Sequence, residues 1–275
     1  MTSVEGRWGT VVLTGATSGI GEATARLLVT RCEVLVVQGP ESADAVAPLL
    51  RELRTRGRAE VHYVPADFTS LDAVVDAARA IRARVPHGID LLINDAGVPG
   101  APERLLTVDG FERTLQVNAL APALLTRLLV PALAAGARIV NVGSSAHRVE
   151  RFHLDDPDLV HDYSPVAAYA RSKLAMVTWS ALLAEEEAGT STTVVALCPG
   201  LNDTPLSAAM MGRIGGPPSR GAERVLHATV ADVPSGSYLE DDRVVAPSPE
   251  VTDPGNRARL AALYVGRLAP VASRR

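Results

Sequence analysis

A tyrosine and a lysine lie four positions apart in the stretch VAAYARSKLAMV, residues 166–177. Four residues make about one turn of an α-helix, so Tyr169 and Lys173 would share one helix face. A free phenol has a pKa of about 10, too high for easy proton exchange near neutral pH. A neighbouring ammonium group favours the phenolate and lowers that pKa. The pair therefore predicts a proton-transfer site, against the alternative of a half-buried tyrosine followed by a solvated lysine.

A glycine-rich turn follows the first apolar segment. In TGATSGIGEATARLL, the residues Gly15, Gly19 and Gly21 stand where a strand would give way to a helix. Glycines at such a turn let the backbone approach a pyrophosphate and aim helix amides at it. The spacing is G-x-x-x-G-x-G rather than G-x-G-x-x-G, and a turn that binds no ligand is the alternative. The order of strand, turn and helix favours a dinucleotide site.

Six short apolar segments alternate with helical patterns along the chain. They are TVVLTG, EVLVVQ, AEVHYVP, IDLLIND, ARIVNVGS and STTVVALCP. This alternation predicts an α/β fold with one doubly wound parallel sheet, Rossmann-like, and helices on both faces. The strands are almost wholly apolar, as strands covered on both faces must be. Helices are expected at about 19–30, 41–56, 70–85, 103–134, 165–188 and 219–230.

The chain is 275 residues long and has neither an internal repeat nor a low-complexity linker, which predicts a single domain over residues 1–275. Two segments interrupt the alternation. Residues 145–165 are polar and rich in turn residues, and residues 200–221 are rich in Gly and Pro. Both would leave the carboxyl ends of strands, where open α/β sheets bind ligands. We therefore expect these segments to be the substrate loops.

Composition excludes several classes of protein. Hydrophobic residues make up 47% and charged residues 21%, which is ordinary for a globular protein. The net charge of −4 offers no electrostatic basis for binding nucleic acid. The start of the chain lacks a signal-peptide pattern, and we expect no membrane span, because four residues interrupt the long apolar stretch 115–142: Pro122, Arg127, Pro131 and Arg138.

Cysteine and histidine spacing predicts no metal site. Cys32 and Cys198 are far apart and belong to no CxxC pair, so neither a disulfide nor a zinc site is expected, and a reducing cytoplasmic location fits. The segment 145–165 contains His147, His153 and His161 among several aspartates, but their spacing matches no metal motif. A solvated loop beside the substrate is the preferred interpretation.

Six motifs together resemble the short-chain dehydrogenase/reductase family. They are TGATSGIG, NDAG at 94–97, VNALAP at 117–122, VNVGSS, YARSK at 169–173 and PGLNDT at 199–204. Each is a weak pattern alone, but their order and spacing span most of the chain, and each falls where a strand ends or a helix begins. The resemblance implies hydride transfer between a nicotinamide and a carbonyl or alcohol carbon.

The resemblance also implies a role for each matched residue. Tyr169 corresponds to the acid/base group, and Lys173 supports it and binds the nicotinamide ribose. Ser144, rather than Ser145, would hold the substrate oxygen, and Asn118 would anchor a water in a proton relay. Asp67 and Thr204 have simpler alternatives, as an acid near a helix start and as a helix cap. The implied cofactor residues, besides Tyr169 and Lys173, are Gly15, Ser18, Gly19, Ile20, Gly21, Gln38, Asp67, Asn94, Ala96, Gly97, Pro199, Gly200 and Thr204.

The sequence departs from the family pattern at several positions. Asp95 replaces a usual asparagine and Gly143 a usual serine. At the end of the second segment, Gln38 can bond a ribose hydroxyl but cannot neutralise a phosphate, which favours NAD. The long separation of Ser144 and Tyr169 resembles the retinol-dehydrogenase-like and WW-domain-oxidoreductase-like branch, which mostly uses NADP. The cofactor is therefore expected to be NAD(P)(H), with the choice between the two left open.

These observations predict an NAD(P)-dependent oxidoreductase of the ketoreductase kind, acting on a small, apolar carbonyl or alcohol. Met210 and Met211 fit flexible contacts to an apolar substrate. One alternative is a dehydratase or epimerase with no net redox change, and another is a silent dinucleotide sensor or scaffold. The resemblance further implies a homodimer or homotetramer that pairs through the helices around 103–134 and 165–188.

Overall fold

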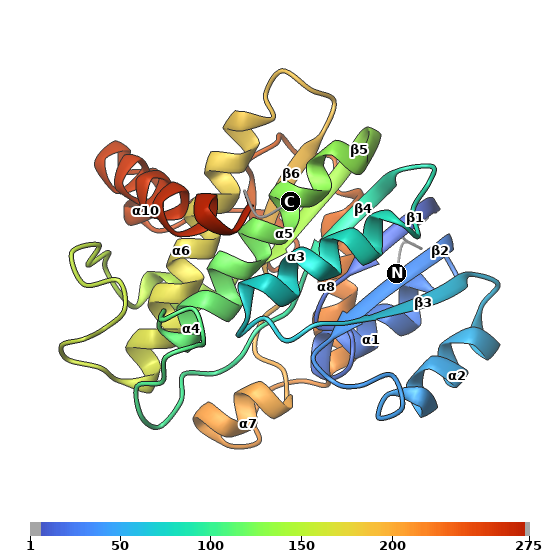
Figure 1. Cartoon of the computed structure of the whole chain (residues 1–275), viewed down its shortest axis with the longest axis horizontal. Helices are drawn as coiled ribbons and strands as arrows, with labels where there is room; N and C mark the ends of the chain where they lie inside the picture. Colours follow the sequence, from blue (N-terminus) through green and yellow to red (C-terminus); the bar gives the residue numbers. More distant parts are fainter. Residues whose placement is uncertain (1–6, 273–275) are drawn as a thin grey trace.

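The computed structural model describes residues 7–272, and one eight-stranded sheet forms its centre (Figure 1). The strand order is β3-β2-β1-β4-β5-β6-β7-β8, and every neighbouring pair is parallel except β7 and β8. The order reverses between β1 and β4, as in doubly wound sheets, so the predicted fold class is confirmed. The strands are β1 (Trp8–Leu13), β2 (Cys32–Gly39), β3 (Glu60–Pro65), β4 (Ile89–Asn94), β5 (Leu133–Val142), β6 (Thr193–Cys198), β7 (Tyr238–Glu240) and β8 (Arg243–Val244).

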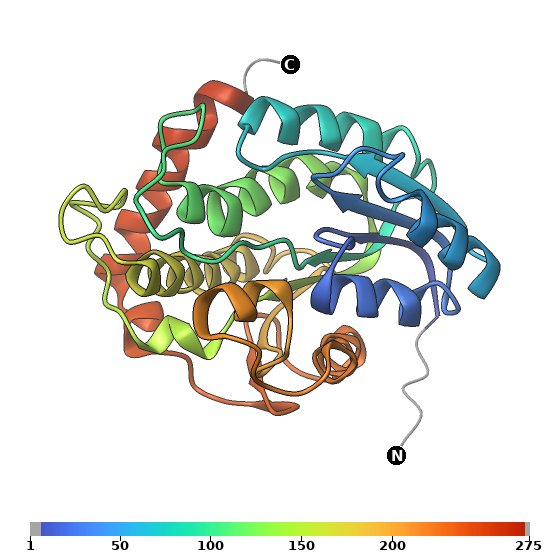
Figure 2. The same cartoon turned by 90° about the horizontal axis from the view of Figure 1, so that it is seen from below.

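Helices cover both faces of the sheet, because successive strand residues point to opposite sides. Val11 and Leu13 pack with α1 (Gly19–Leu28), α2 (Ala47–Arg56) and α8 (Pro218–Val230). Val12 packs on the opposite face, and Figure 2 shows the two layers on either side of the strands. The helices of that second face are α3 (Leu71–Arg82), α5 (Ala121–Leu129), α6 (Pro165–Glu186) and α10 (Pro254–Ala272).

The helix predicted at 103–134 is shorter than expected at its amino end. Residues 103–112 instead form a turn in which Gly110, with a φ of +83°, donates its amide to Thr107. Glu112 then caps α4 (Arg113–Leu115) by accepting hydrogen bonds from the first helical amides. A π-helical segment, η1 (Gln116–Leu120), joins α4 to α5, and a 3₁₀ turn, η2 (Val130–Ala132), precedes β5.

The continuous helical stretch Arg113–Ala132 is long and apolar enough, by length and composition alone, to cross a membrane. Within the protein, however, 78% of its most apolar window is buried against other elements. The central helix of a folded domain meets the same criterion, since a helix that is apolar all round is one that other elements surround.

The carboxyl-terminal helix α10 closes the second face and was not predicted. Leu260, Tyr264 and Leu268 lie on one side of α10 at helical spacing and are buried in the core shared with α3, α5 and α6. The rings of Tyr264 and Trp179 of α6 have centroids 6.5 Å apart. Figures 1 and 2 both show α10 beside α6. Five more short elements lay outside the prediction: η3 (Ser145–Arg148), α7 (Pro205–Met211), α9 (Pro249–Thr252) and the strands β7 and β8.

The second predicted helix, at 41–56, begins later, at Ala47. Pro48 stands in its first turn, where the missing amide costs no helical hydrogen bond. The other four predicted helices match observed helices to within a few residues at each end.

Candidate active site

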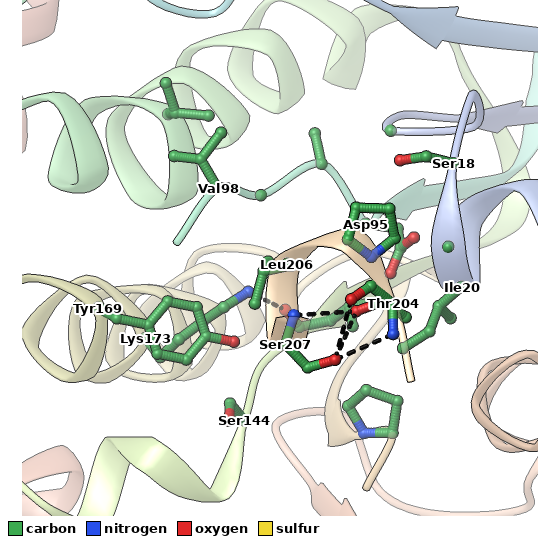
Figure 3. Close-up of a pocket in the computed structure, with 18 of the residues that line it drawn as sticks. Ser18, Ile20, Asp95, Val98, Ser144, Tyr169, Lys173, Thr204, Leu206 and Ser207 are labelled. Atoms are coloured by element: carbon green, nitrogen blue, oxygen red, sulfur yellow. Dashed lines mark hydrogen bonds between the residues drawn. The ribbon is translucent and has the colours of Figure 1, made fainter. Parts of the chain in front are cut away.

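A cavity of about 880 Å³ lies at the carboxyl ends of the central strands (Figure 3). Its walls come from the glycine-rich turn, the ends of β2 and β3, the loop after β4, η3, α6 and the segment after β6. Most of the predicted site residues line it together. They are Gly15, Ser18, Gly19, Ile20, Gln38, Asp67, Ala96, Gly97, Ser144, Tyr169, Lys173, Pro199, Gly200 and Thr204.

The glycine-rich turn requires its glycines for both conformation and space. Gly15 has a φ of +66°, and a Cβ there would stand 2.6 Å from the Cα of Ala96. A Cβ on Gly21 would stand 2.1 Å from the carbonyl oxygen of Gly15, so this residue serves the packing of the turn and lies outside the cavity lining. Ser18, the N-cap of α1, makes no side-chain cap hydrogen bond. The first amides of α1 therefore face the cavity as an anion site that fits a pyrophosphate.

Gln38 bonds the backbone at both ends of its side-chain amide. The side chain is 2% exposed, its Oε1 accepts from the amide of Gly15 at 3.3 Å, and its Nε2 donates to the carbonyl of Ala66 at 2.8 Å. Each polar end thereby has one partner within the protein, while Gln38 still lines the cavity, so the predicted hydrogen bond with a ribose hydroxyl stays a prediction. Gln38 ties the glycine-rich turn of β1 to the end of β3.

Asn94, which was predicted to bind the cofactor, has a structural role at the end of β4. Asn94 is buried outside the cavity lining, where its Nδ2 donates to Asn141 Oδ1 at 2.8 Å and Thr126 Oγ1 at 3.0 Å. The predicted contact with the adenine ribose is therefore wrong for Asn94, whose amide joins β4 to β5 and α5. The following Ala96 and Gly97 do line the cavity.

Asn118 also lies outside the cavity lining, in the π-helical segment η1. Its Oδ1 accepts from the amide of Val98 at 2.8 Å, and its Nδ2 donates to the Val98 carbonyl at 3.0 Å and to Ser172 Oγ at 2.9 Å. A Cβ on Gly97 would lie 3.4 Å from Asn118 Oδ1 and 3.6 Å from Lys173 Nζ. The observed bonds of Asn118 hold the loop after β4 against Lys173, and the predicted water relay stays a prediction.

Asp67 and Thr204 both have the simpler roles considered above while also lining the cavity. Asp67 Oδ1 accepts from the amide of Thr69 at 2.9 Å, just before α3 begins. Thr204 is the N-cap of α7, and its hydroxyl accepts from the amide of Ser207 at 3.2 Å in a capping box. A Cβ on Gly19 would lie 3.2 Å from the Thr204 methyl, so this cap packs directly on the glycine-rich turn.

Tyr169, Lys173 and Ser144 meet at the inner end of the cavity (Figure 3). Ser164 caps α6 by accepting from the amide of Ala167, which sets the helix phase that places Tyr169 and Lys173 on one face. Ser144 is the N-cap of η3, and its Oγ accepts from the amide of Ala146 at 3.2 Å. Because that bond uses a lone pair, the Ser144 hydroxyl proton remains available to an acceptor in the cavity.

The electrostatics differ from the sequence-based expectation of a phenol made acidic by its lysine. Burial raises the pKa of Tyr169 to about 12, although its hydrogen bond with Ser144 acts in the opposite direction. Lys173 Nζ lies 5.8 Å from the centroid of the Tyr169 ring and donates to the carbonyl of Val142 at 2.9 Å. Burial lowers the pKa of Lys173. In this buried setting the cost of desolvating a phenolate outweighs its attraction to Lys173.

Asp95 adds a third ionisable group to this end of the cavity. It follows β4, and a Cβ on Gly21 would lie 2.7 Å from its Oδ2. Burial raises the pKa of Asp95, while the positive charge of Lys173 lowers it. The Asp95 charge in turn raises the pKa of both Lys173 and Tyr169. The departure from the family's usual asparagine was visible in the sequence, but its position beside the lysine was not.

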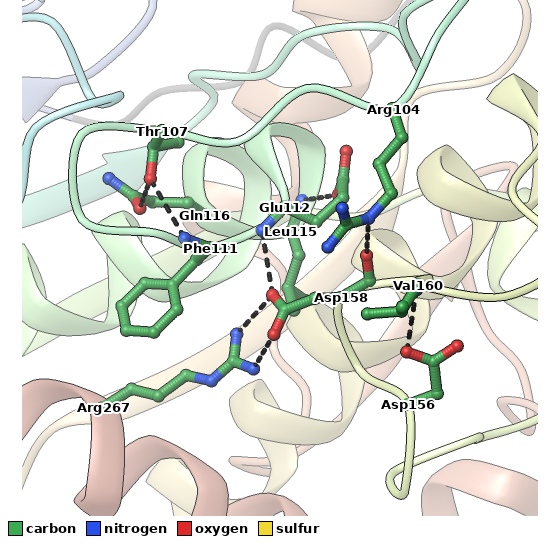
Figure 4. A network of polar contacts seen from close by, with 10 residues as sticks. All are labelled: Arg104, Thr107, Phe111, Glu112, Leu115, Gln116, Asp156, Asp158, Val160 and Arg267. Carbon is green, nitrogen blue, oxygen red and sulfur yellow. Dashed lines mark hydrogen bonds and ion pairs between the residues drawn. The ribbon is translucent and has the colours of Figure 1, made fainter.

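The predicted loop 145–165 is anchored through Asp158 (Figure 4). The carboxylate of Asp158 accepts from the amide of Glu112 at 2.8 Å and forms an ion pair with Arg267 of α10. Its carbonyl accepts from Arg104 Nε at 2.7 Å, and the Arg267 guanidinium lies 4.4 Å from the centroid of the Phe111 ring. These bonds hold the loop to α10 and to the segment before α4. Within the loop, only Ser145, Ala146 and Val149 line the cavity.

The second predicted loop, 200–221, is folded rather than open. It contains α7, and Asn202 is buried, with its Nδ2 donating to the carbonyls of Pro199 and Gly200 and its Oδ1 accepting from the amide of Gly221. Ser207 Oγ donates to the Asn202 carbonyl at 2.7 Å. The loop presents apolar side chains to the cavity, namely Leu201, Leu206, Met210 and Met211.

The histidines of the first loop do not gather. His153 and His161 are exposed, whereas His147 is fully buried, so the expectation of a solvated loop is wrong for His147. Over residues 7–272, no three His, Cys, Asp or Glu side chains are grouped so as to hold a metal ion. Cys32 and Cys198 are both free thiols.

Three further residues line the cavity and were not predicted: Pro40 and Glu41, which follow β2, and Thr17, which belongs to the glycine-rich turn after β1. A Cβ on Gly39 would lie 2.8 Å from Thr17 Oγ1 and 2.9 Å from Glu41 Oε2, which places both polar groups beside the strand end. The position of Glu41 just after the second strand was the available signal, but the role expected at that place was given to Gln38.

Comparison with known proteins gives consistent matches. The family model described as short chain dehydrogenase matches residues 9–212. Polyprenol dehydrogenase of Mus musculus is 35% identical over 274 residues, covering 90% of this chain and 80% of that protein. Retinol dehydrogenase 13 of Homo sapiens is 35% identical over 291 residues, covering 95% and 86%. The crystal structure of an uncharacterized protein from Mycobacterium paratuberculosis superposes with a TM-score of 0.80 at 32% identity, covering 95% and 93%.

Proposed function

The chain belongs to the short-chain dehydrogenase/reductase family, and from this premise we propose that Tyr169, Ser144 and Lys173 serve hydride transfer to or from the carbonyl or alcohol carbon of an apolar substrate. The chain is an NAD(P)-dependent oxidoreductase. The observation that carries the proposal is the meeting of these three side chains at the inner end of a cavity that also contains the glycine-rich turn.

The residues present fit a nicotinamide dinucleotide. The glycine-rich turn admits a close backbone approach, and the start of α1 directs amides at a pyrophosphate, as shown above. When bound, the nicotinamide supplies or accepts the hydride. Lys173 lines the cavity, and its Nζ lies 3.6 Å from where a Cβ on Gly97 would stand. From this position Nζ would donate a hydrogen bond to a ribose hydroxyl.

The ionisation state of Tyr169 suits carbonyl reduction. With its pKa raised to about 12, the phenol is neutral at physiological pH and holds a proton that it can donate to a carbonyl oxygen. The Ser144 hydroxyl, whose lone pair is occupied by the Ala146 amide, donates a second hydrogen bond to the same oxygen. In the direction of alcohol oxidation, Tyr169 first loses its proton, and the Lys173 ammonium then stabilises the phenolate.

The walls of the outer cavity support an apolar substrate. Val149, Val166, Leu201 and Met211 line the cavity while remaining 50–63% exposed, so they form an apolar mouth open to solvent. Exposed apolar side chains gathered at a cavity are typical of a binding surface. The names of the relatives, polyprenol dehydrogenase and retinol dehydrogenase 13, support the same substrate class of apolar alcohols and aldehydes.

The end of β2 favours NAD over NADP. The Glu41 carboxylate and the Thr17 hydroxyl flank Gly39, where the adenosine ribose lies in doubly wound folds. A carboxylate accepts hydrogen bonds from ribose hydroxyls and repels a phosphate. The two basic residues that line the cavity, Arg113 and Lys173, are on α4 and α6 rather than at this strand end.

Replacing Glu41 tests the cofactor preference. We expect wild-type protein to bind NADH more tightly than NADPH, and Glu41→Gln to improve the Kd for NADPH about fivefold, since one surface charge contributes on the order of 1 kcal/mol. Glu33→Gln removes the same charge from an exposed site near the start of β2 and should change neither Kd. Tighter binding of NADPH than NADH by the wild-type protein would contradict the preference.

Replacing Tyr169 tests the reaction itself. Tyr169→Phe should reduce kcat about a thousandfold or more, because the proton donor is lost, while the Kd for NADH changes little. Reduction of a series of apolar aldehydes, followed by nicotinamide absorbance, measures kcat. A stoichiometric absorbance change excludes the dehydratase or epimerase alternative, and any turnover by the wild-type protein excludes the silent sensor. Turnover retained by Tyr169→Phe would refute the role of the phenol.

Assembly and location stay predictions. The resemblance implies a homodimer or homotetramer that pairs through the helices around 103–134 and 165–188. In the structure α10 already covers the face of α5 and α6, so pairing there would require α10 to move. The two free thiols support the proposal of a reducing compartment such as the cytoplasm.

A further inference from the structure

His147 is a buried titratable group that the proposed reaction does not use. It lies in η3, three residues after Ser144, and is fully buried. Its ring meets the ring of Tyr238 edge to face, with centroids 4.8 Å apart. The two ring nitrogens each have one partner: Nδ1 lies 2.6 Å from the carbonyl oxygen of Ser144, and Nε2 lies 3.0 Å from the backbone nitrogen of Ser248.

These two partners determine the tautomer of the ring. The Ser248 amide can only donate, so Nε2 of His147 accepts and carries no proton. The single proton of the neutral ring therefore lies on Nδ1 and is donated to the Ser144 carbonyl. A protonated ring would set an Nε2–H against the Ser248 amide. Burial lowers the pKa of His147 and so keeps the ring neutral.

We propose that His147 is a positioning residue that holds the Ser144 hydroxyl at its working position by clamping the backbone of η3 to residues 245–252. The inference rests on the proposed role of Ser144. Since Ser144 Oγ accepts from the amide of Ala146 in the same turn, the orientation of the hydroxyl follows the backbone of η3. A displacement of about 1 Å at a reacting group can reduce a rate about a hundredfold.

Further contacts join η3 and the residues just after it to β7 and to residues 245–252. Arg148 donates to the carbonyl of Ala246 at 2.8 Å and pairs with Glu240 of β7 at 2.9 Å. Glu250 Oε2 accepts from the amide of Phe152 at 3.1 Å. Of the charges near the His147 ring, Arg148 lowers its pKa and Glu240 raises it. His147 is the member of this set that bonds the Ser144 residue itself.

Two amide variants separate the two hydrogen bonds. His147→Asn places a side-chain NH₂ near the position of Nδ1 and can still donate to the Ser144 carbonyl. His147→Gln reaches the position of Nε2 and can accept from Ser248, but it loses the bond to Ser144. With the better of NADH and NADPH and with decanal as the probe, we expect His147→Gln to lose kcat about 10- to 100-fold with little change in KM. His147→Asn should recover most of that loss.

A double variant tests whether the effect passes through Ser144. If it does, Ser144→Ala combined with His147→Gln has the kcat of Ser144→Ala alone. Losses that multiply would overturn the proposal, as would full activity in His147→Gln. His87→Gln, at an exposed histidine before β4, is the matched control and should retain wild-type kcat. A wild-type protein inactive on every aldehyde would instead count against the proposed function.

The proposed tautomer of His147 can also be tested without measuring enzyme turnover. Nitrogen-15 NMR of the histidine rings should show Nδ1 protonated and Nε2 bare in His147, with a pKa below that of a free imidazole. An Nε2–H tautomer in His147 would overturn the clamp, because the Ser248 amide would then have no acceptor on the ring.

Discussion

Asp95 places a carboxylate in the cavity wall, where its charge raises the pKa of both Tyr169 and Lys173. Asp95→Asn keeps the size of the side chain and removes this charge, so both pKa values should fall. In alcohol oxidation the ionised phenol accepts the proton, and a lower pKa makes that form available at lower pH. We therefore predict that the acidic limb of the kcat/KM profile moves to lower pH by up to about one unit, or about 1.4 kcal/mol.

Initial rates of decanol oxidation between pH 5 and pH 10 measure this shift. Asp76→Asn, at an exposed acid on α3, is the control and should leave the profile unchanged. A limb that moves to higher pH in Asp95→Asn would show that the carboxylate acts on the site in some other way.

The positions of individual side chains were predictable where the regular repeat of a helix determines which side chains share a face. Tyr169 and Lys173 share a face because α6 is regular, and the cavity contains both. The partners of Gln38 and Asn94 were not predictable, because their amides bond groups on other elements that the sequence does not bring together. His147 was placed in a solvated loop because its partner Ser248 is 101 positions away.

At the scale of elements, the turn from β1 into α1 depends on close approach to the loop after β4. Gly15→Ala would combine an unfavourable positive φ with a Cβ 2.6 Å from Ala96 Cα. We predict a loss of NADH affinity of at least about tenfold, because the turn must shift to relieve the clash. Gly136→Ala is the matched control: its φ is +78°, but nothing lies within 4 Å of the added Cβ.

Calorimetric titration with NADH and urea unfolding separate the two effects. Gly136→Ala should lose about 1–2 kcal/mol of unfolding free energy from backbone strain and keep its NADH affinity. If Gly15→Ala bound NADH as tightly as Gly136→Ala, close packing of this turn would not be required for the cofactor site.

The order of strands and helices followed from the alternating pattern, but element ends depended on local chemistry. The helix expected at 103–134 starts only after the Gly110 turn and the Glu112 cap, although apolar residues continue upstream of both. The apolar spacing of Leu260, Tyr264 and Leu268 was present in the sequence and would have revealed α10. The strands β7 and β8 are too short to give a pattern.

For the whole molecule, α10 completes the core with an imperfect contact. Tyr264 is buried against Trp179, and among the described residues its hydroxyl has no hydrogen-bond partner. Removing an unsatisfied buried hydroxyl relieves a desolvation cost of about 1–3 kcal/mol. We predict that Tyr264→Phe raises the unfolding free energy by about 1 kcal/mol and leaves kcat unchanged.

Urea unfolding with kinetics on the same samples checks this prediction. Tyr264→Ala, which also removes the ring, should instead cost about 3–5 kcal/mol through the cavity it leaves. A destabilised Tyr264→Phe would mean that the hydroxyl finds a partner after all.

The place of α10 in the chain has a consequence for how the protein reaches its native state. During synthesis α3, α5 and α6 leave the ribosome well before the helix that shields them. Their hydrophobic outer faces stay exposed to solvent until Leu260, Tyr264 and Leu268 emerge. The nascent chain therefore passes through an aggregation-prone intermediate with an incomplete core. Chaperone dependence and loss to aggregation should therefore concentrate in the interval of translation between the emergence of α6 and the docking of α10.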